Sequence, residues 1–126
     1  AMVDDIERIG DHVTNIAHLA EYKKQGRAHF SKDAEKEVER IQNLVAENIE
    51  DARLLILNKS EQRIKAIFER EKIVDELVKQ ARENHLERFY KGICLAMAGA
   101  IFIDLLVNLE RISDHCMNIA EYVEQL

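Results

Sequence analysis

Apolar residues recur every three or four positions along almost the whole chain, which is the spacing that places them on one face of an α-helix. Ser31 and Ser60 precede the second and third apolar stretches, and serine is a favoured N-cap. Gly26 and Gly92 follow the first and third stretches, where helices commonly end. The sequence therefore predicts four helices, over residues 3–24, 31–57, 60–90 and 93–126.

The predicted connections are only a few residues long, and loops of that length make consecutive helices antiparallel neighbours. The chain has 126 residues, no proline and four glycines, which suits one domain with few interruptions. We expect an all-α fold: an antiparallel up-down bundle of four long helices that forms a single domain over residues 1–126.

The most apolar stretch of the chain covers residues 93–107 and contains Asp104. A helix that spans a bilayer needs about 20 apolar residues, so this stretch is too short. We expect it to be a central helix of the bundle that is buried on most of its sides.

One motif occurs at both ends of the chain. Residues 7–17 read ERIGDHVTNIA and residues 110–120 read ERISDHCMNIA, with eight of the eleven positions identical. A long apolar half-helix precedes the second copy, whereas almost nothing precedes the first. A repeat of this kind is typical of a structure built from similar units. The simplest interpretation is that the chain begins inside a longer protein, near the end of one repeat.

Both copies of the motif have the same helical layout. Ile9, Val13, Ile16 and Ala20 share one face of the first helix, and Ile112, Cys116, Ile119 and Val123 share the corresponding face of the last. Acidic residues stand on the other side of each helix at a spacing of four, where like charges repel. These pairs indicate either a solvated acidic face or a bound cation, and they are Glu7 with Asp11 and Glu110 with Asp114. Glu47 and Asp51 have the same spacing but are assigned to solvent.

The third helix places charged groups within its apolar stripe. The stripe comprises Ile64, Ile67, Phe68, Val74, Val78, Ala81, Leu86 and Phe89. Glu71 and Asp75 fall inside it, as do Arg82 and His85. Buried carboxylates are costly unless they are paired or bound to metal. This helix is therefore expected to present two carboxylates to its neighbours.

A hairpin that turns near Gly92 brings residue i level with residue 184 − i, since both helices rise equally per residue. Glu71 and Asp75 then meet Asp114 and Glu110 at one height. Four carboxylates suit a divalent cation or iron, whereas a salt-bridge network would use Arg8, Arg82 or Arg111 as the counter-charge. His12 and His115 lie beside the acidic stripes. They could add nitrogen ligands to a metal, or they could be solvated residues without such a role. The sequence leaves these alternatives open.

Other classes of function find little support. No glutamate has a histidine three residues later, so a ferritin-like di-iron enzyme is not expected. Neither a glycine-rich phosphate loop nor a nucleophile with a base is recognisable, and we expect no enzyme. The net charge of −6 argues against nucleic acid or an anionic membrane surface as the main partner. Cys94 and Cys116 indicate reduced thiols rather than a disulfide framework.

The strings NLERISDHCMNIAEYV and DDIERIGDHVTNIA resemble the two copies of the PhoU family signature, and EREKIVDEL and HLERFYKGIC also resemble that family. The resemblance covers the chain from Val3 to Leu126. It implies a fold built from repeated three-helix units that bind metal, often iron or zinc, and a role in the negative control of phosphate uptake. The ligands it implies are Glu7, Asp11, Glu71, Asp75, Glu110 and Asp114.

The string GICLAMAGAIFIDLLVNLERISDH is more similar to the C-terminal domain of sodium-dependent phosphate cotransporters than to standalone PhoU proteins. This resemblance implies a regulatory domain at the cytoplasmic face of the inner membrane. Its partners would be the membrane domain of the same transporter, a metal ion, and further copies in a homodimer or higher oligomer. A standalone PhoU regulator and a purely structural, metal-free helix-docking bundle are the alternatives.

Overall fold

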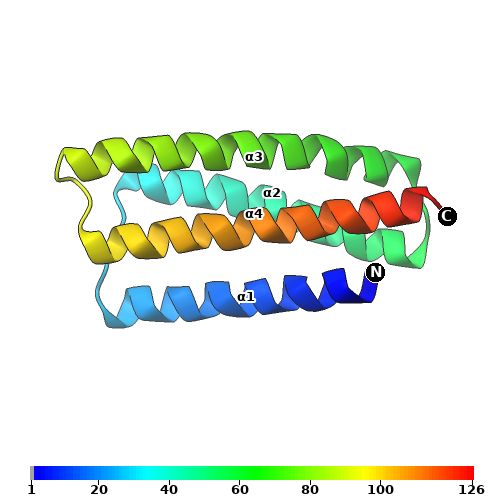
Figure 1. Cartoon of the computed structure of the whole chain (residues 1–126), viewed down its shortest axis with the longest axis horizontal. Helices are drawn as coiled ribbons and strands as arrows, with labels where there is room; N and C mark the ends of the chain where they lie inside the picture. The colour runs from blue at the N-terminus through cyan, green and yellow to red at the C-terminus, as the bar shows by residue number, and fades with distance from the viewer. Residues whose placement is uncertain (1) are drawn as a thin grey trace.

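The computed structural model describes residues 2–126, and these residues form four helices and no strand. The helices are α1 (Met2–Gln25), α2 (Lys32–Leu57), α3 (Glu61–Tyr90) and α4 (Ala96–Glu124). They run alternately in opposite directions along one long axis, and the two ends of the chain lie at the same end of the bundle (Figure 1). The predicted all-α, antiparallel up-down bundle is confirmed.

Both predicted serine caps are present. Ser31 Oγ accepts a hydrogen bond from the backbone N–H of Ala34 at 3.1 Å. Ser60 Oγ accepts one from the backbone N–H of Arg63 at 3.3 Å. Each cap satisfies a backbone donor that would lack an intrahelical partner. The starts of α2 and α3 are therefore determined by local sequence.

The start of α4 was predicted three residues too early. Helix α3 ends in a Schellman motif, in which the N–H of Ile93 reaches the carbonyl of Arg88 at 2.9 Å. The N–H of Gly92 reaches the carbonyl of Phe89 at 3.1 Å, and Gly92 has a φ of +72°. The residues after this turn form the connection that reverses the direction of the chain, so α4 begins only at Ala96.

The left-handed conformation of Gly92 yields a test. Gly92→Ala is expected to lower the free energy of unfolding by about 1 kcal/mol, because a Cβ is disfavoured at positive φ. Gly10→Ala is the matched control, since Gly10 lies inside α1 with nothing within 4 Å of an added Cβ. Alanine there favours the helix, so this control should cause no loss. Urea denaturation checks both variants, and equal losses would contradict the role of the turn.

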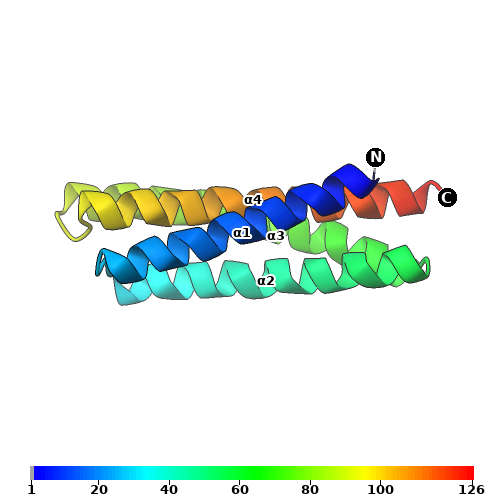
Figure 2. The same cartoon turned by 90° about the horizontal axis from the view of Figure 1, so that it is seen from below.

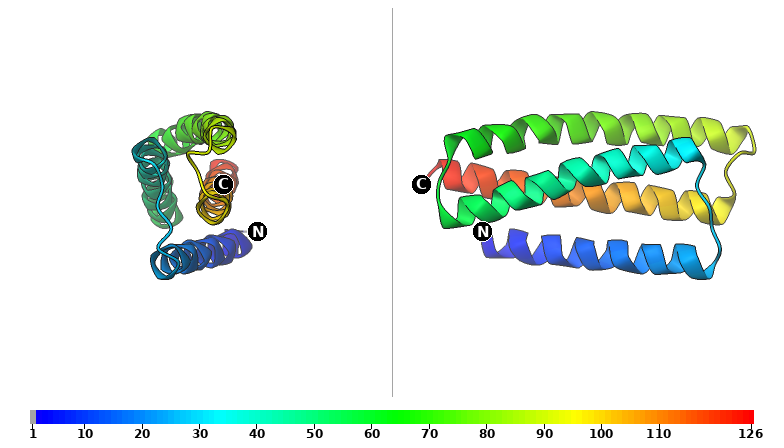
Figure 3. Two further views of the ribbon diagram at one scale, coloured as in Figure 1. Left: turned by 90° about the vertical axis from the view of Figure 1, so that its left-hand side faces the viewer. Right: turned by 180° about the vertical axis from the view of Figure 1, so that it is seen from behind.

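The hydrophobic core lies between α2, α3 and α4, and α4 is the only helix that contacts all the others within residues 2–126. The prediction that residues 93–107 are buried on most of their sides was only partly right. One face is buried, through Ala98, Ile101, Phe102, Leu105 and Leu106, whereas Leu95, Met97 and Asp104 are exposed. None of the helices described is long and apolar enough to cross a membrane. Seen along the bundle, α1 lies outside the triangle that the other three helices form (Figure 3).

Helix α1 packs mainly against α4, and none of its side chains is fully buried. Ile6 and Ile9 also line a hollow together with Ile49, Ala52 and Ile56 of α2. The partly buried positions of α1 alternate by three and four residues, which is the narrow seam of a coiled coil: Met2, Asp5, Ile9, His12, Ile16, Leu19 and Lys23. The predicted stripe was therefore partly wrong, because Val13 is 46% exposed and Ala20 is exposed too. Figure 2 shows α1 inclined to the other helices.

The packing stripe of α4 was predicted correctly, since Ile112, Cys116, Ile119 and Val123 are all buried. The stripe predicted for α3 holds over most of its length but fails at its end. Leu86 and Phe89 are about half exposed there. That end of the bundle therefore carries uncovered apolar side chains.

Candidate metal centre

Three carboxylates meet halfway along the α3–α4 interface. Glu71 and Asp75 lie one turn apart on α3, and Asp114 projects from α4. One oxygen atom from each of the three lies within 4.8 Å of the others. Glu71 is buried, whereas Asp75 and Asp114 are exposed. We call these three residues the carboxylate cluster.

The cluster follows the predicted register in part. Glu71 was expected level with residue 113, and it does meet Asp114. Asp75 was expected within the stripe but faces water at the rim of the cluster. Glu110 does not join the cluster, because the guanidinium of Arg82 lies 3.6 Å from its carboxylate. Both alternatives therefore describe part of the site: three carboxylates gather, and the fourth forms an ion pair.

The protonation of Glu71 reflects this crowding. Burial, hydrogen bonding with Asp114 and the negative charge of Asp75 raise the pKa of Glu71 to about 8. Burial also raises the pKa of Glu110, and the charge of Arg82 opposes that rise. Among the ion pairs of the described residues, none includes a member of the cluster. At neutral pH the cluster therefore needs a proton or a cation to offset its charge.

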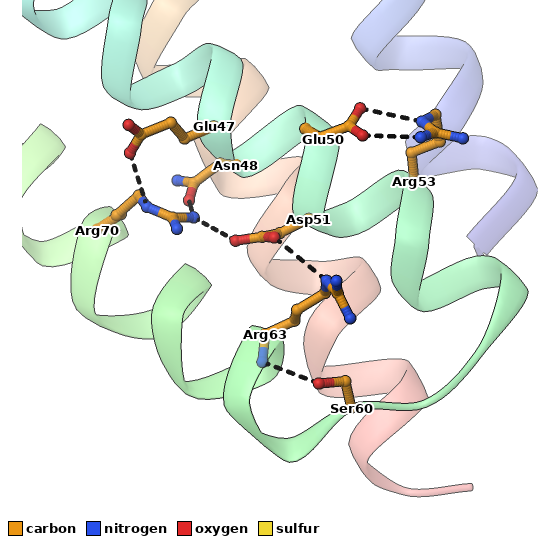
Figure 4. Close-up of polar contacts among 8 residues, drawn as sticks. All are labelled: Glu47, Asn48, Glu50, Asp51, Arg53, Ser60, Arg63 and Arg70. Carbon is orange, nitrogen blue, oxygen red and sulfur yellow. Dashed lines mark hydrogen bonds and ion pairs between the residues drawn. The ribbon is translucent and has the colours of Figure 1, made fainter.

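A buried polar network beside the cluster was missed at the level of sequence. Arg70 donates from Nη1 to Asn48 at 3.1 Å and to Asp51 at 2.7 Å (Figure 4). Asn48, which is fully buried, donates from Nδ2 to Ser113 Oγ at 3.1 Å. Asn48 on α2 thus contacts both Arg70 and Ser113. These two residues directly precede Glu71 and Asp114 in the chain. The available signal was an asparagine inside an apolar stripe, since such a side chain needs partners.

The assignment of Glu47 and Asp51 to solvent was partly wrong. Glu47 is 59% exposed, although its carboxylate lies 3.0 Å from Arg70 Nε. Asp51 is only 17% exposed and lies between Arg70 and Arg63, the latter at 3.5 Å (Figure 4). Both carboxylates therefore pair with Arg70, although Glu47 stays largely exposed and Asp51 does not.

The other predicted ligands lie on or toward α1. Glu7 and Asp11 are exposed on α1, away from the carboxylate cluster. His115 Nδ1 lies 2.9 Å from Asp5, and His12 Nδ1 lies 2.9 Å from Asn108.

The two histidine rings stack with their centroids 5.8 Å apart. Asn118 donates to Asp5 at 3.1 Å, which adds a further polar contact between the helices. These residues join α1 to α4 and do not reach the cluster.

The sequence of this chain is similar to those of known proteins. The family model described as the PhoU domain matches residues 38–123, which covers most of α2 and α4 and all of α3. The phosphate-specific transport system accessory protein PhoU homolog 1 of Thermotoga maritima is 26% identical over 120 residues. The match covers 95% of this chain and 51% of that protein, so the chain spans about half the length of this curated relative. No solved structure matches significantly.

Proposed function

The chain belongs to the PhoU domain family, and we propose that it is a regulatory domain that binds a metal ion and modulates phosphate uptake. The observation that carries the metal part is the convergence of Glu71, Asp75 and Asp114 within the matched residues. The printed name of the Thermotoga relative, an accessory protein of phosphate-specific transport, supports the phosphate part. The accessory role in that printed name also favours a regulatory over a catalytic role.

The residues of the cluster fit a metal ion. Oxygen donors suit hard divalent cations and iron, and zinc also accepts carboxylates. Glu71 and Asp75 would hold the ion from α3, and Asp114 would hold it from α4. Glu110 and Arg82 would stand outside the ligand set as a neighbouring ion pair. A bound cation would supply the positive charge that lets all three carboxylates ionise, and would thereby link α3 to α4.

Glu7 and Asp11 repeat Glu110 and Asp114 in sequence, and we propose that they form a second metal site. That site requires a helix equivalent to α3 packed against α1. Such a helix would come from another three-helix unit, in a second copy of the chain or elsewhere in the same protein. Glu7 and Asp11 are both exposed on α1, so this face is open to such a helix.

Two settings are compatible with this role. The similarity of residues 92–115 to cotransporter domains supports a domain that acts on the membrane part of a sodium-dependent phosphate transporter, at the cytoplasmic face. The name of the Thermotoga relative favours the alternative, a standalone accessory regulator. The coding sequence upstream of residue 1 distinguishes them, because several apolar segments of about 20 residues there would indicate a transporter.

Elemental analysis of the purified protein tests the metal proposal. We expect close to one iron or other divalent ion per chain, and a melting temperature that falls by a few degrees when a chelator removes it. Asp114→Asn should reduce both the metal content and the effect of the chelator. Glu35→Gln/Glu39→Gln is the matched control, because these exposed carboxylates of α2 share the same spacing outside the cluster. Little metal together with identical melting curves would refute metal binding and favour the purely structural bundle.

A further inference from the structure

One end of the bundle carries a group of large apolar side chains in water. They belong to the last two turns of α3, the connection that follows and the first turn of α4 (Figure 1). Tyr90 is 85% exposed and Leu95 is 77% exposed. We call this group the apolar tip, and it consists of Leu86, Phe89, Tyr90, Ile93, Leu95 and Met97.

The same end is basic, although the chain as a whole is acidic. The α1–α2 connection lies at this end too (Figure 1), so residues 23–37 and 86–97 come together there. These two segments contain seven Lys and Arg against four Asp and Glu, a net charge of +3. Since the chain carries −6, the remaining residues carry −9. The whole-chain charge therefore conceals a strongly uneven distribution.

Acidic residues at the far end of the bundle do not cancel the charge of the basic end at physiological salt, although Glu21, Glu39 and Glu83 border the two segments and reduce it. A helix of the length of α3, 30 residues, extends about 45 Å. The Debye length is about 8 Å under these conditions, so charges at the far end are screened. A charged surface that approaches the apolar tip therefore meets a local net positive charge. The expectation against an anionic membrane, which rested on net charge alone, does not hold for this end.

We infer that the apolar tip docks on the surface of an anionic lipid bilayer. Aromatic side chains such as Phe89 and Tyr90 favour the boundary between lipid and water. Lysines and arginines beside them are attracted to anionic headgroups. The apolar tip combines the end of α3, the connection that follows and the first turn of α4, all at one end of an elongated bundle (Figure 1). The proposal is independent of the metal and phosphate roles.

Sedimentation with lipid vesicles tests the proposal on the full chain. We expect binding to vesicles of phosphatidylcholine mixed with phosphatidylglycerol, weakened by added salt, and little binding to phosphatidylcholine alone. Leu95→Ser/Met97→Ser should weaken binding about tenfold or more, because both side chains would leave the bilayer. Lys24→Gln/Lys91→Gln should weaken it about fivefold for each charge removed. All four side chains are exposed, so the variants should fold, and circular dichroism verifies this.

Matched controls come from elsewhere on the surface. Leu57→Ser/Leu126→Ser removes equally exposed apolar side chains, at 66% and 78%, from the opposite end. Lys65→Gln/Lys79→Gln removes two exposed lysines from α3, one near its start and one past its middle, both away from the apolar tip. Both should leave vesicle binding unchanged. The proposal is overturned if the unaltered chain does not bind the anionic vesicles, or if the controls weaken binding as much as the variants of the tip.

Discussion

Metal-free protein is expected to lose stability as the pH rises from about 5 to about 9, because Glu71 must then ionise inside the fold. Its pKa is about 8 in the folded state, against an ordinary value of 4.5. Between these values the folded state holds a proton that the unfolded chain has lost, so stability falls with rising pH. The loss begins above 4.5 and is complete above 8. We expect roughly 3 kcal/mol, less than the full shift implies, since water reaches Asp75 and Asp114 and screens the charges.

Chelator-treated samples melted over this pH range give the measurement. Glu71→Gln should remove most of the slope and make the protein more stable than the wild type at high pH, because the amide stays neutral. Glu69→Gln alters an exposed carboxylate two positions away on α3 and should leave the slope unchanged. Saturating metal should flatten or reverse the wild-type slope, since a cation favours the ionised carboxylates. A flat profile for the metal-free wild type would show that the cluster is not strained by its charges.

Arg70→Ala is expected to lower the free energy of unfolding by about 3 kcal/mol. The side chain of Arg70 is 22% exposed, and it holds Asn48 and Asp51 together (Figure 4). Without it, the buried oxygen of Asn48 loses its donor, and Asp51 keeps only the longer contact to Arg63. Removal of one partner from a largely buried network costs far more than the net value of the pair. Urea denaturation gives the value.

Arg53→Ala is the control, and Figure 4 shows why it is informative. Arg53 makes two contacts to Glu50, at 3.0 and 2.7 Å, as short as those of Arg70. Both partners are more than half exposed, and exposed pairs add little to stability. We expect almost no change, so a loss equal to that of Arg70→Ala would show that burial does not decide the effect. Arg70→Ala should also reduce metal content, because Asn48 would hold residue 70 less firmly beside Glu71.

Much of the fold was predictable because it depends on local chemistry. Helical spacing gave the four helices, and Ser31 and Ser60 fixed two of their starts. The carboxylate cluster was predictable in part, since Glu71 falls within an apolar stripe and the hairpin sets its height. Asp114 followed from the repeated motif. These features need only the geometry of one helix or one hairpin.

The features that the sequence did not predict depend on how each helix is rotated about its axis and where it lies relative to the others. The pairing of Arg82 with Glu110 and of Arg70 with Asp51 depends on which long side chain reaches which carboxylate. The placement of α1 outside the main core could not be read from its apolar residues, because its motif is nearly identical to that of the buried α4. Similar sequence faces therefore acquired different burial, because α4 packs against three helices and α1 mainly against one.

The attachment of α1 has a consequence for how the molecule opens. Since α1 buries no side chain fully and packs mainly against α4, its release costs far less than unfolding of the other three helices. The seam also contains polar contacts, such as that between Asp5 and His115. The protein thus carries a tethered helix that occupies one face of α4 at high effective concentration. Any ligand for that face would have to compete with this tethered helix.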